Sequence, residues 1–321
     1  MELKNSIDSI STRVQHLGII AIMVRGGDAF VAVQWIAASA VLSTTAYLVV
    51  AARLFGWRAM VQGYFSDVVQ RNIRFTGHMG ALSLINIVLL QFDKLVVSKL
   101  LPIANVGYYS FASTVVVRIS FAVTAISQAA LPSLSGLHRQ GETQPMLVQY
   151  RKLQDLICYG VLPLFAAVVF GALPLYGYLF NRQVAWLLLL PTALLSLGFF
   201  MNASVNVPYT FSVAVGKPQI ASRSNALALL VVPPATTILV VLFGITGAAC
   251  SWVIYHVFLY LYMIPRICNE CLKIPVRAWY LHMGRVLGLS AATYGSAWPL
   301  IVIPGSYSRI ALVSGYLAGS L

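Results

Sequence analysis

Charged residues are scarce in this sequence, and acidic residues are the rarest of them. Of 321 residues, 21 are Lys or Arg and only 8 are Asp or Glu, whereas 59% are hydrophobic. Charged residues make up 9% of the chain, against about 25% in a typical soluble domain. This composition excludes an ordinary soluble protein, and the mean hydropathy of +0.83 predicts an integral membrane protein.

Patterns that carry enzyme chemistry are also missing from the sequence. It contains no nucleophile beside a base, no Walker loop and no dinucleotide fingerprint. Cys268 and Cys271 have C-x-x-C spacing, but a metal site needs two further ligands and no His or Cys pair lies nearby at the usual spacing. The N-terminal residues show no signal peptide. We therefore expect a protein that is not an enzyme and that needs no metal or cofactor.

Long apolar stretches, by contrast, are abundant. A helix needs about 20 apolar residues to cross a bilayer. The predicted spans are 14–27, 29–52, 77–99, 105–132, 156–178, 184–213, 224–243, 246–264, 283–303 and 308–321. The predicted fold class is all-α, a polytopic transmembrane helix bundle of about ten spans. The connections are too short to form a soluble domain, which argues against a membrane-bound polysaccharide polymerase or ligase with a large outer loop.

Basic residues gather at every second connection between the spans. The richer side holds Lys4, Arg13, Arg53, Arg58, Arg71, Arg74, Arg139, Arg151, Lys152, Lys217, Arg223, Arg266, Lys273, Arg277 and Arg285. The opposite connections hold only Arg25, Lys99, Arg182 and Arg309. By the positive-inside rule, both ends of this chain are predicted to be cytoplasmic. The net charge of +13 indicates contact with anionic membrane lipid and does not indicate nucleic acid.

Two segments on this basic side, 64–76 and 144–155, have amphipathic patterns. We predict that they form helices that lie on the inner membrane surface. An equal alternative is that they are only connectors between spans.

Three ionisable residues fall deep inside predicted spans. Such residues cost roughly 2.5–3.5 kcal/mol on insertion scales and are therefore candidates for function. Arg118 and Lys94 are predicted to line a cavity for an anionic substrate, because the planar guanidinium of Arg suits a diphosphate. Asp93 would pair with Arg118 or would hold a proton or a sodium ion. The alternative is an interhelical ion pair that only joins two spans.

Four further residues are candidates for contact with substrate. Arg25 lies where the first span meets the outer surface, where it would bind substrate or anchor the helix at the interface. Asn202, Asn206 and Tyr209 recur at helical spacing and so share one helix face. They are candidate sugar contacts, with interhelical hydrogen bonding as the alternative. Prolines interrupt several spans and would supply the bends of a transporter.

Two short motifs resemble a known family of transporters. Residues 91–112 are QFDKLVVSKLLPIANVGYYSFA, and residues 131–137 are LPSLSGL. The first resembles a helix ending in D-(R/K)-hydrophobic, then a short outer turn and a G-x-Y-x-x-A helix start. The second resembles an LP-x-(L/F)-S helix ending. The matching residues are Asp93, Lys94, Gly107, Tyr109, Ala112, Leu131, Pro132, Leu134 and Ser135. With further similarities at 24–35 and at the Gly216-Lys217 loop, the chain resembles the polysaccharide-flippase branch of the multidrug/oligosaccharidyl-lipid/polysaccharide exporter superfamily.

The resemblance implies a transporter of two lobes around a central cavity, of which this chain would be a fragment that lacks the first spans. Residues 1–55 would end the first lobe, and 56–76 would form a cytoplasmic amphipathic connector. Residues 77–265 would form a second lobe of six spans, and 266–321 a terminal pair of spans. The resemblance also implies that Arg118 faces the cavity, where two lobes rock in alternating access.

The predicted function is the export of polyprenyl-diphosphate-linked oligosaccharide across the bacterial inner membrane. This step would serve the synthesis of O-antigen for lipopolysaccharide, of capsule or of exopolysaccharide, with polysaccharide assembly proteins as expected partners. A multidrug or cation-coupled antiporter of the same superfamily is the main alternative. An antiporter cavity would favour acidic residues, whereas the basic groups at membrane depth outnumber the one carboxylate here.

Overall fold

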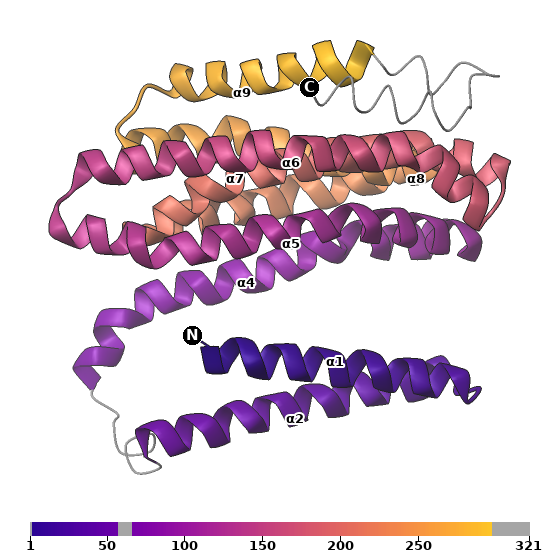
Figure 1. Ribbon diagram of the computed structural model, residues 1–321, viewed down its shortest axis with the longest axis horizontal. Helices are drawn as coiled ribbons and strands as arrows, with labels where there is room; N and C mark the ends of the chain where they lie inside the picture. Colours follow the sequence, from indigo (N-terminus) through magenta and orange to yellow (C-terminus); the bar gives the residue numbers. More distant parts are fainter. Residues whose placement is uncertain (1, 57–65, 297–321) are drawn as a thin grey trace. The chain divides into compact units, whose positions relative to one another are not determined.

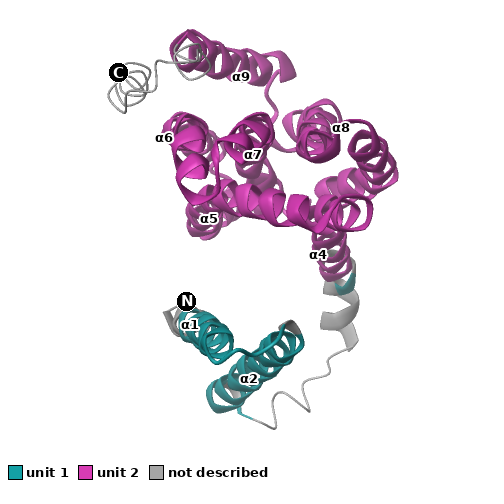
Figure 2. Cartoon of the chain, turned by 90° about the vertical axis from the view of Figure 1, so that its right-hand side faces the viewer, with its two compact units in different colours: residues 1–73 teal, residues 74–321 magenta. Residues whose placement is uncertain are grey.

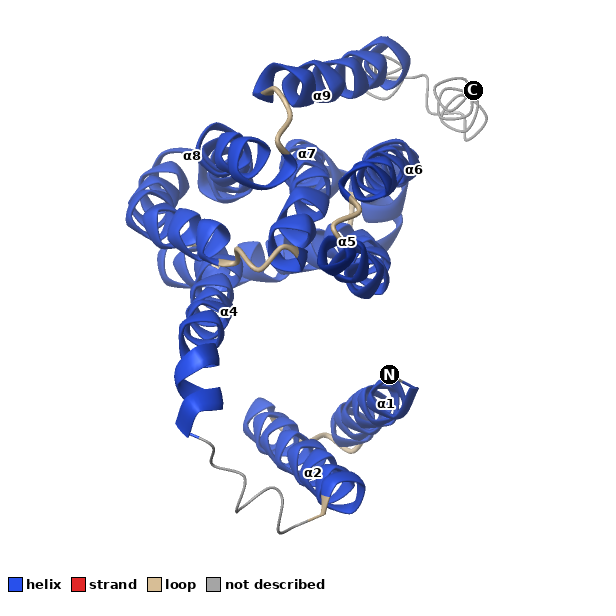
Figure 3. Ribbon diagram, turned by 90° about the vertical axis from the view of Figure 1, so that its left-hand side faces the viewer, coloured by secondary structure: helices blue, strands red, loops and turns tan. Residues whose placement is uncertain are grey.

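The computed structural model describes residues 2–56 and 66–296, which form long helices joined by short turns (Figure 1). No strand occurs among these residues (Figure 3). The helices are α1 (Glu2–Val24), α2 (Ala29–Phe55), α4 (Ser66–Leu100), α5 (Ile103–Gln140), α6 (Thr143–Leu179), α7 (Arg182–Ala214), α8 (Gln219–Ile267) and α9 (Val276–Ser290). Two π-helical turns, η1 (Cys268–Leu272) and η2 (Ala291–Gly295), follow α8 and α9. The predicted all-α class is confirmed.

Six helices of the described part are long and apolar enough to cross a membrane. The six segments are Phe30–Leu54, Thr76–Leu100, Ile103–Gln140, Thr143–Leu179, Arg182–Ala214 and Gln219–Leu272. A shorter apolar helix, Ser9–Val24, coincides with the predicted first span. The chain is therefore a multi-pass helical membrane protein. The predicted span 308–321 and the end of 283–303 lie outside the described residues, so the total of about ten spans stays a prediction.

The last of the six segments contains two spans, because α8 consists of two helices that meet at Gly244. Gly244 has φ 58° and ψ −135°, a conformation that is essentially restricted to glycine. Close by, a Cβ added at Gly247 would lie 1.9 Å from the carbonyl oxygen of Leu239. The two halves of α8 therefore approach closely at this turn, which lies between the predicted spans 224–243 and 246–264.

The two amphipathic segments are helical but are not separate surface helices. The chain from Ser66 onward continues without a break along α4, and residues 144–155 continue along α6. In α6 the apolar side chains of Met146, Tyr150 and Leu153 are buried in the bundle. For 144–155 this corrects the prediction of a surface helix. For 64–76 the position at the membrane surface stays a prediction, and residues 64 and 65 lie outside the described residues. In α6, tertiary packing covers the apolar face that would otherwise rest on lipid, whereas Ile73 of the first segment is exposed. In both cases an unbroken helix keeps its backbone hydrogen bonds.

The chain divides into two compact units, residues 1–73 and 74–321 (Figure 2). In the first unit, α1 and α2 pack as a pair. Nε1 of Trp35 donates to the carbonyl oxygen of Gln15 at 3.1 Å, and the Trp35 ring lies where a side chain on Gly18 would be. Oδ1 of Asp28 accepts from the backbone N–H of Val31 at 2.9 Å and so caps α2.

The second unit is built around α7. This helix is in contact with α5, α6 and α8, and Figures 2 and 3 show it between α6 and α8. Its buried residues run from Val184 to Ala214 and occur on all its sides, as expected for a helix that is apolar all round. The few polar side chains of α7 therefore face other helices, and this arrangement positions the polar cavity described below.

Candidate functional site

Asp93 is a buried junction between three helices. It lies in α4 with only 3% of its surface exposed. Its Oδ2 accepts a hydrogen bond from the Tyr109 hydroxyl of α5 at 2.5 Å and another from Nε1 of Trp252 of α8 at 2.9 Å. Its Oδ1 accepts from the backbone N–H of Lys94 at 2.8 Å. Asp93 and Tyr109 of the first sequence motif are thus hydrogen-bonded to each other.

The predicted pairing of Asp93 with Arg118 does not occur. Among the described residues, the ion pair of the structure joins Nε2 of His282 to Oδ1 of Asp155 at 3.5 Å. The Tyr109 hydroxyl and the Trp252 indole N–H both donate to Asp93, so they satisfy its carboxyl group without an ion pair. Asp93 therefore has a clear role in joining helices, and its predicted role in holding a proton or a sodium ion stays a prediction.

Arg118 lies on the exposed side of α5. Its Cζ is 5.7 Å from the centre of the Phe121 ring. Apart from Phe121, the exposed residues of this side are small or polar: Thr114, Arg118, Ala122, Ala125, Gln128 and Ala129. The exposed side of α8 is different, with Leu230, Val231, Ile238, Val241 and Leu242. Long apolar side chains suit lipid, whereas small and ionisable residues suit protein contacts or a water-filled cavity. The α5 face thus lacks the chemistry of a lipid-facing surface.

The two other candidate cations differ in their surroundings. Lys94 is half-buried beside Asp93 on α4, and its ammonium makes no ion pair with any described residue. Arg25 is exposed just after the last residue of α1. Lys94 and Arg118 belong to the unit 74–321, whereas Arg25 belongs to the unit 1–73. A shared role of the three in substrate binding stays a prediction.

Asn202, Asn206 and Tyr209 all line one cavity of about 130 Å³ within the second unit. Residues of α4 and α8 complete its wall, among them Asn86 and Asn225. A water molecule occupies about 30 Å³ of liquid volume, so the cavity has room for about four water molecules in this conformation. Its polar groups are amides and hydroxyls, which suit water or a sugar hydroxyl, and contact with sugar stays a prediction.

Part of the cavity wall consists of interhelical hydrogen bonds. Nδ1 of His256 faces the carbonyl oxygen of Trp252 at 2.8 Å. Since a carbonyl only accepts, Nδ1 carries the proton and Nε2 accepts from Nδ2 of Asn202 at 3.0 Å. On the opposite wall, Nδ2 of Asn225 donates to Oδ1 of Asn86 at 2.7 Å. Asn202 therefore makes the interhelical hydrogen bond that was predicted as its alternative role. The polar side-chain atoms of Asn206 and Tyr209 have no partner among the described residues.

Sequence reasoning missed several residues of these two clusters. Asn86 precedes Asp93 by seven residues, about two helical turns, so the spacing alone would have placed both on one face. Trp252, Asn225 and Tyr255 lie far along the chain from α4, and no local pattern links them to it. Only the packing of α8 against α7 and α4 brings them to the same place.

The comparisons with known proteins agree with the motifs. Residues 1–138 match the family described as "Polysaccharide biosynthesis protein". A relative from Shigella flexneri, named "Putative O-antigen transporter", is 27% identical over 198 residues, a match that covers 61% of this chain and 47% of the relative. The chain thus spans about half the length of this curated relative. No solved structure matches the chain.

Both motifs, at 91–112 and 131–137, fall within the matched residues 1–138. The fold defines the protein class first, a multi-pass helical membrane protein. The matches confirm the predicted resemblance to polysaccharide flippases. Over residues 1–138 the chain is thus similar to the family described as "Polysaccharide biosynthesis protein".

Proposed function

We propose that this chain is part of a flippase that exports polyprenyl-diphosphate-linked oligosaccharide across the bacterial inner membrane. The exported units would serve O-antigen, capsule or exopolysaccharide synthesis. The similarity of residues 1–138 to a polysaccharide biosynthesis family supports this function, and so does the transporter name of the relative. In this proposal both ends of the chain are cytoplasmic, polysaccharide assembly proteins are partners, and the unit 74–321 forms most of one of two rocking lobes.

The observation that carries the proposal is the exposed face of α5 with Arg118 at its centre. Arg118 lies 15 residues after Ile103, the first residue of α5, which is about 22 Å along the helix. At this depth an arginine that faces lipid would be very costly, whereas one that faces a cavity can bind an anionic cargo. A diphosphate needs such a partner, because a free charge in hydrocarbon is prohibitively unfavourable.

The same face argues against an antiporter for cationic drugs. No acidic residue occurs anywhere in α5, from Ile103 to Gln140. Asp93 of α4, which bonds to Tyr109 of α5, is buried, and its carboxyl group is occupied by side-chain donors. Anionic cargo fits the charge of the α5 face, and cationic cargo does not.

The test replaces Arg118 in the complete protein and measures export. In a strain that lacks its own flippase and makes the cognate sugar, Arg118→Ala should abolish surface polysaccharide and leave lipid-linked oligosaccharide on the cytoplasmic face. Arg118→Lys should restore only part of the export, since an ammonium cannot bind a diphosphate in two places at once. Arg139→Ala is the matched control, because Arg139 is an exposed arginine at the end of the same helix. Normal export by Arg118→Ala at normal protein level would refute the proposed role.

A further inference from the structure

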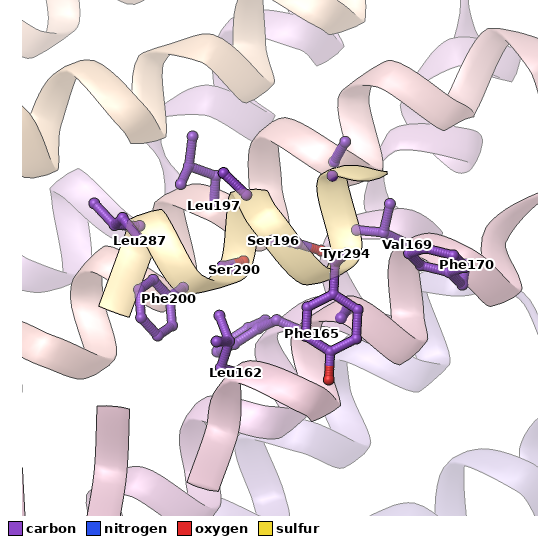
Figure 4. A pocket seen from close by; sticks show the side chains of 14 residues that line it. Leu162, Phe165, Val169, Phe170, Ser196, Leu197, Phe200, Leu287, Ser290 and Tyr294 are labelled. Atoms are coloured by element: carbon purple, nitrogen blue, oxygen red, sulfur yellow. The ribbon is translucent and has the colours of Figure 1, made fainter. Parts of the chain in front are cut away.

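The seam between α6 and α9 contains two cavities. The first has a volume of about 270 Å³ and lies between residues 150–155 of α6 and residues 274–282. The second, of about 330 Å³, lies farther along both helices, between α6, α7 and residues 287–295. Figure 4 shows the second cavity, where Leu287, Ser290 and Tyr294 of the α9–η2 segment lie over side chains of α6 and α7. We call this region the α6–α9 seam.

The first cavity is lined by buried polar groups that lack partners. Tyr150, Gln154 and Trp279 are each 3% exposed, and all three line the cavity. The Tyr150 hydroxyl and Nε1 of Trp279 are neighbours, but their geometry is not that of a hydrogen bond, and neither they nor Oε1 of Gln154 bond to any described residue. Buried polar atoms nearly always have a hydrogen-bond partner, so three of them around one cavity indicate a bound polar group.

Donors and acceptors are distributed unevenly around this cavity. The indole N–H of Trp279 and the guanidinium of Arg151 can only donate, and the Tyr150 hydroxyl can also donate. Together they suit the oxygens of a phosphate group. Oε1 of Gln154 can only accept, and its amide nitrogen already donates to the carbonyl oxygen of Ser204 at 3.0 Å. A ligand that satisfies both sides therefore carries a phosphate and a hydroxyl.

The charge around the first cavity favours an anion. Arg151 is followed by Lys152, and Ile274 and Pro275 of the cavity wall are flanked by Lys273 and Arg277. The acidic residue of the wall, Asp155, is paired with His282. The positive charges thus outnumber the acidic group at this end of the seam.

The second cavity is apolar and suits a hydrocarbon chain. Its wall includes Leu162, Phe165, Phe200 and Leu287, and also the exposed Ala291. One side of α6 lines both cavities. Ring pairs of about equal separation hold α6 to the α9–η2 segment along the way. Tyr159 and His282 are 6.0 Å apart between ring centres, and Phe170 and Tyr294 are 6.1 Å apart.

The length of the seam matches one leaflet of a bilayer. From Asp155 to Phe170 the helix rises about 22 Å. One leaflet including its headgroup region is about 20–22 Å thick, half of the full bilayer. A polar cavity at the headgroup level therefore leaves the apolar cavity within the same leaflet, where an acyl chain would lie.

We propose that the α6–α9 seam binds one anionic glycerophospholipid of the phosphatidylglycerol type. Its phosphate accepts from Arg151 and Trp279, its headgroup hydroxyl donates to Oε1 of Gln154, and one acyl chain fills the apolar cavity. The lipid fastens α9 to α6 on the basic side of the membrane. This proposal is independent of the transported cargo.

The headgroup part is tested by titrating the purified, delipidated protein with lipids and counting bound molecules by native mass spectrometry. Phosphatidylglycerol should bind at least about fivefold more tightly than phosphatidylethanolamine with the same acyl chains, which is the effect of roughly one basic contact. Arg151→Gln and Trp279→Phe should each weaken phosphatidylglycerol binding by a similar factor. Lys152→Gln is the matched control, since it removes the same charge from the neighbouring position outside the cavity wall.

The acyl part is tested with a bulky residue in the wall of the second cavity. Ala291→Trp should weaken phosphatidylglycerol binding, whereas Ala292→Trp should not, because both alanines are exposed and only Ala291 lines the cavity. If the Ala291→Trp variant does not fold, the unchanged protein is titrated with phosphatidylglycerol that has short acyl chains. This lipid should bind more weakly than the long-chain lipid.

Three outcomes would overturn the proposal. The first is equal binding of phosphatidylglycerol and phosphatidylethanolamine, or no retained lipid at all. The second is that the variants at Arg151, Trp279 and Ala291 bind like their controls. The third is a polyprenyl phosphate that displaces phosphatidylglycerol through the same residues, which would make the seam a site for the cargo. None of these outcomes depends on whether Arg118 is needed for export.

Discussion

Single residues fix the helix arrangement around Asp93. An aspartate at membrane depth is costly on its own, and here the cost is offset by the Tyr109 hydroxyl and the Trp252 indole. The three side chains come from α4, α5 and α8, so one acidic residue orients three helices. Together with the backbone N–H of Lys94, these donors satisfy the Asp93 carboxyl group without an ion pair.

Tyr109→Phe should destabilise the protein, because it removes one donor from the buried Asp93 and leaves the ring in place. A loss of about 1–2 kcal/mol is expected, measured as a lower midpoint of thermal unfolding in detergent. Tyr108→Phe is the control, since Tyr108 packs edge-on against Phe180 at 5.2 Å between ring centres and its hydroxyl has no partner in the described part of the chain. Equal midpoints for the two variants would contradict the role given to Asp93.

The sequence indicated that Asp93 and Arg118 were special but not what each would contact. Spacing within one helix shows which face a residue shares, as for Asn202, Asn206 and Tyr209 around their cavity. Contacts between helices depend on packing. Asp93 and Trp252 are 159 residues apart, and no pattern in either segment points to the other.

At the scale of elements, glycine rather than proline divides the chain. Pro132, Pro163, Pro174, Pro191 and Pro208 lie inside helices that continue past them. An apolar surrounding leaves few alternatives to the helix, because any other conformation would leave backbone groups without partners. The internal departure from helical angles is at Gly244. The positive φ of Gly244 turns the chain back. The missing backbone N–H of each proline does not end its helix.

Gly244→Ala should lower the yield and stability of the folded protein, because a Cβ strains the backbone at φ 58°. Such conformations cost about 1–3 kcal/mol for other residues. The folded fraction and the melting temperature after purification measure the effect. Gly160→Ala is the control: it lies inside α6 with nothing within 4 Å of the added Cβ, so a gain in helix propensity is expected. A normal yield of Gly244→Ala would show that the turn does not need glycine.

At the scale of the whole molecule, the alternation of basic connections corresponds to a real grouping in space. Two connections that were assigned to the same side meet in the structure, where Nζ of Lys217 donates to the carbonyl oxygen of Glu270 at 3.0 Å. Residues 150–155 and 274–282, both assigned to that side, line one cavity. Within the unit 74–321, these connections therefore lie on one side, as the sequence predicts, while the assignment of that side to the cytoplasm depends on the positive-inside rule.

Labelling of single cysteines should establish that orientation. In a variant of the complete protein without its natural cysteines, Gln140→Cys should react with a membrane-impermeant thiol reagent only after the cells are permeabilised. Ala104→Cys, at the opposite end of α5, should react in intact cells. Both positions are exposed, so a difference in labelling reports the side of the membrane. The reverse pattern would mean that the basic connections lie outside.

The sequence by itself determined that this protein is a helical membrane protein, where most of its spans lie and which family it resembles. These properties depend on local composition, because a bilayer admits only helices whose backbone groups are satisfied within the segment. The tertiary structure decided the rest. It joined the amphipathic segments to α4 and α6, gave Asp93 hydroxyl and indole partners in place of Arg118, and formed the cavities of the α6–α9 seam. These features depend on which faces of distant helices pack together, and such packing is a property of the whole unit.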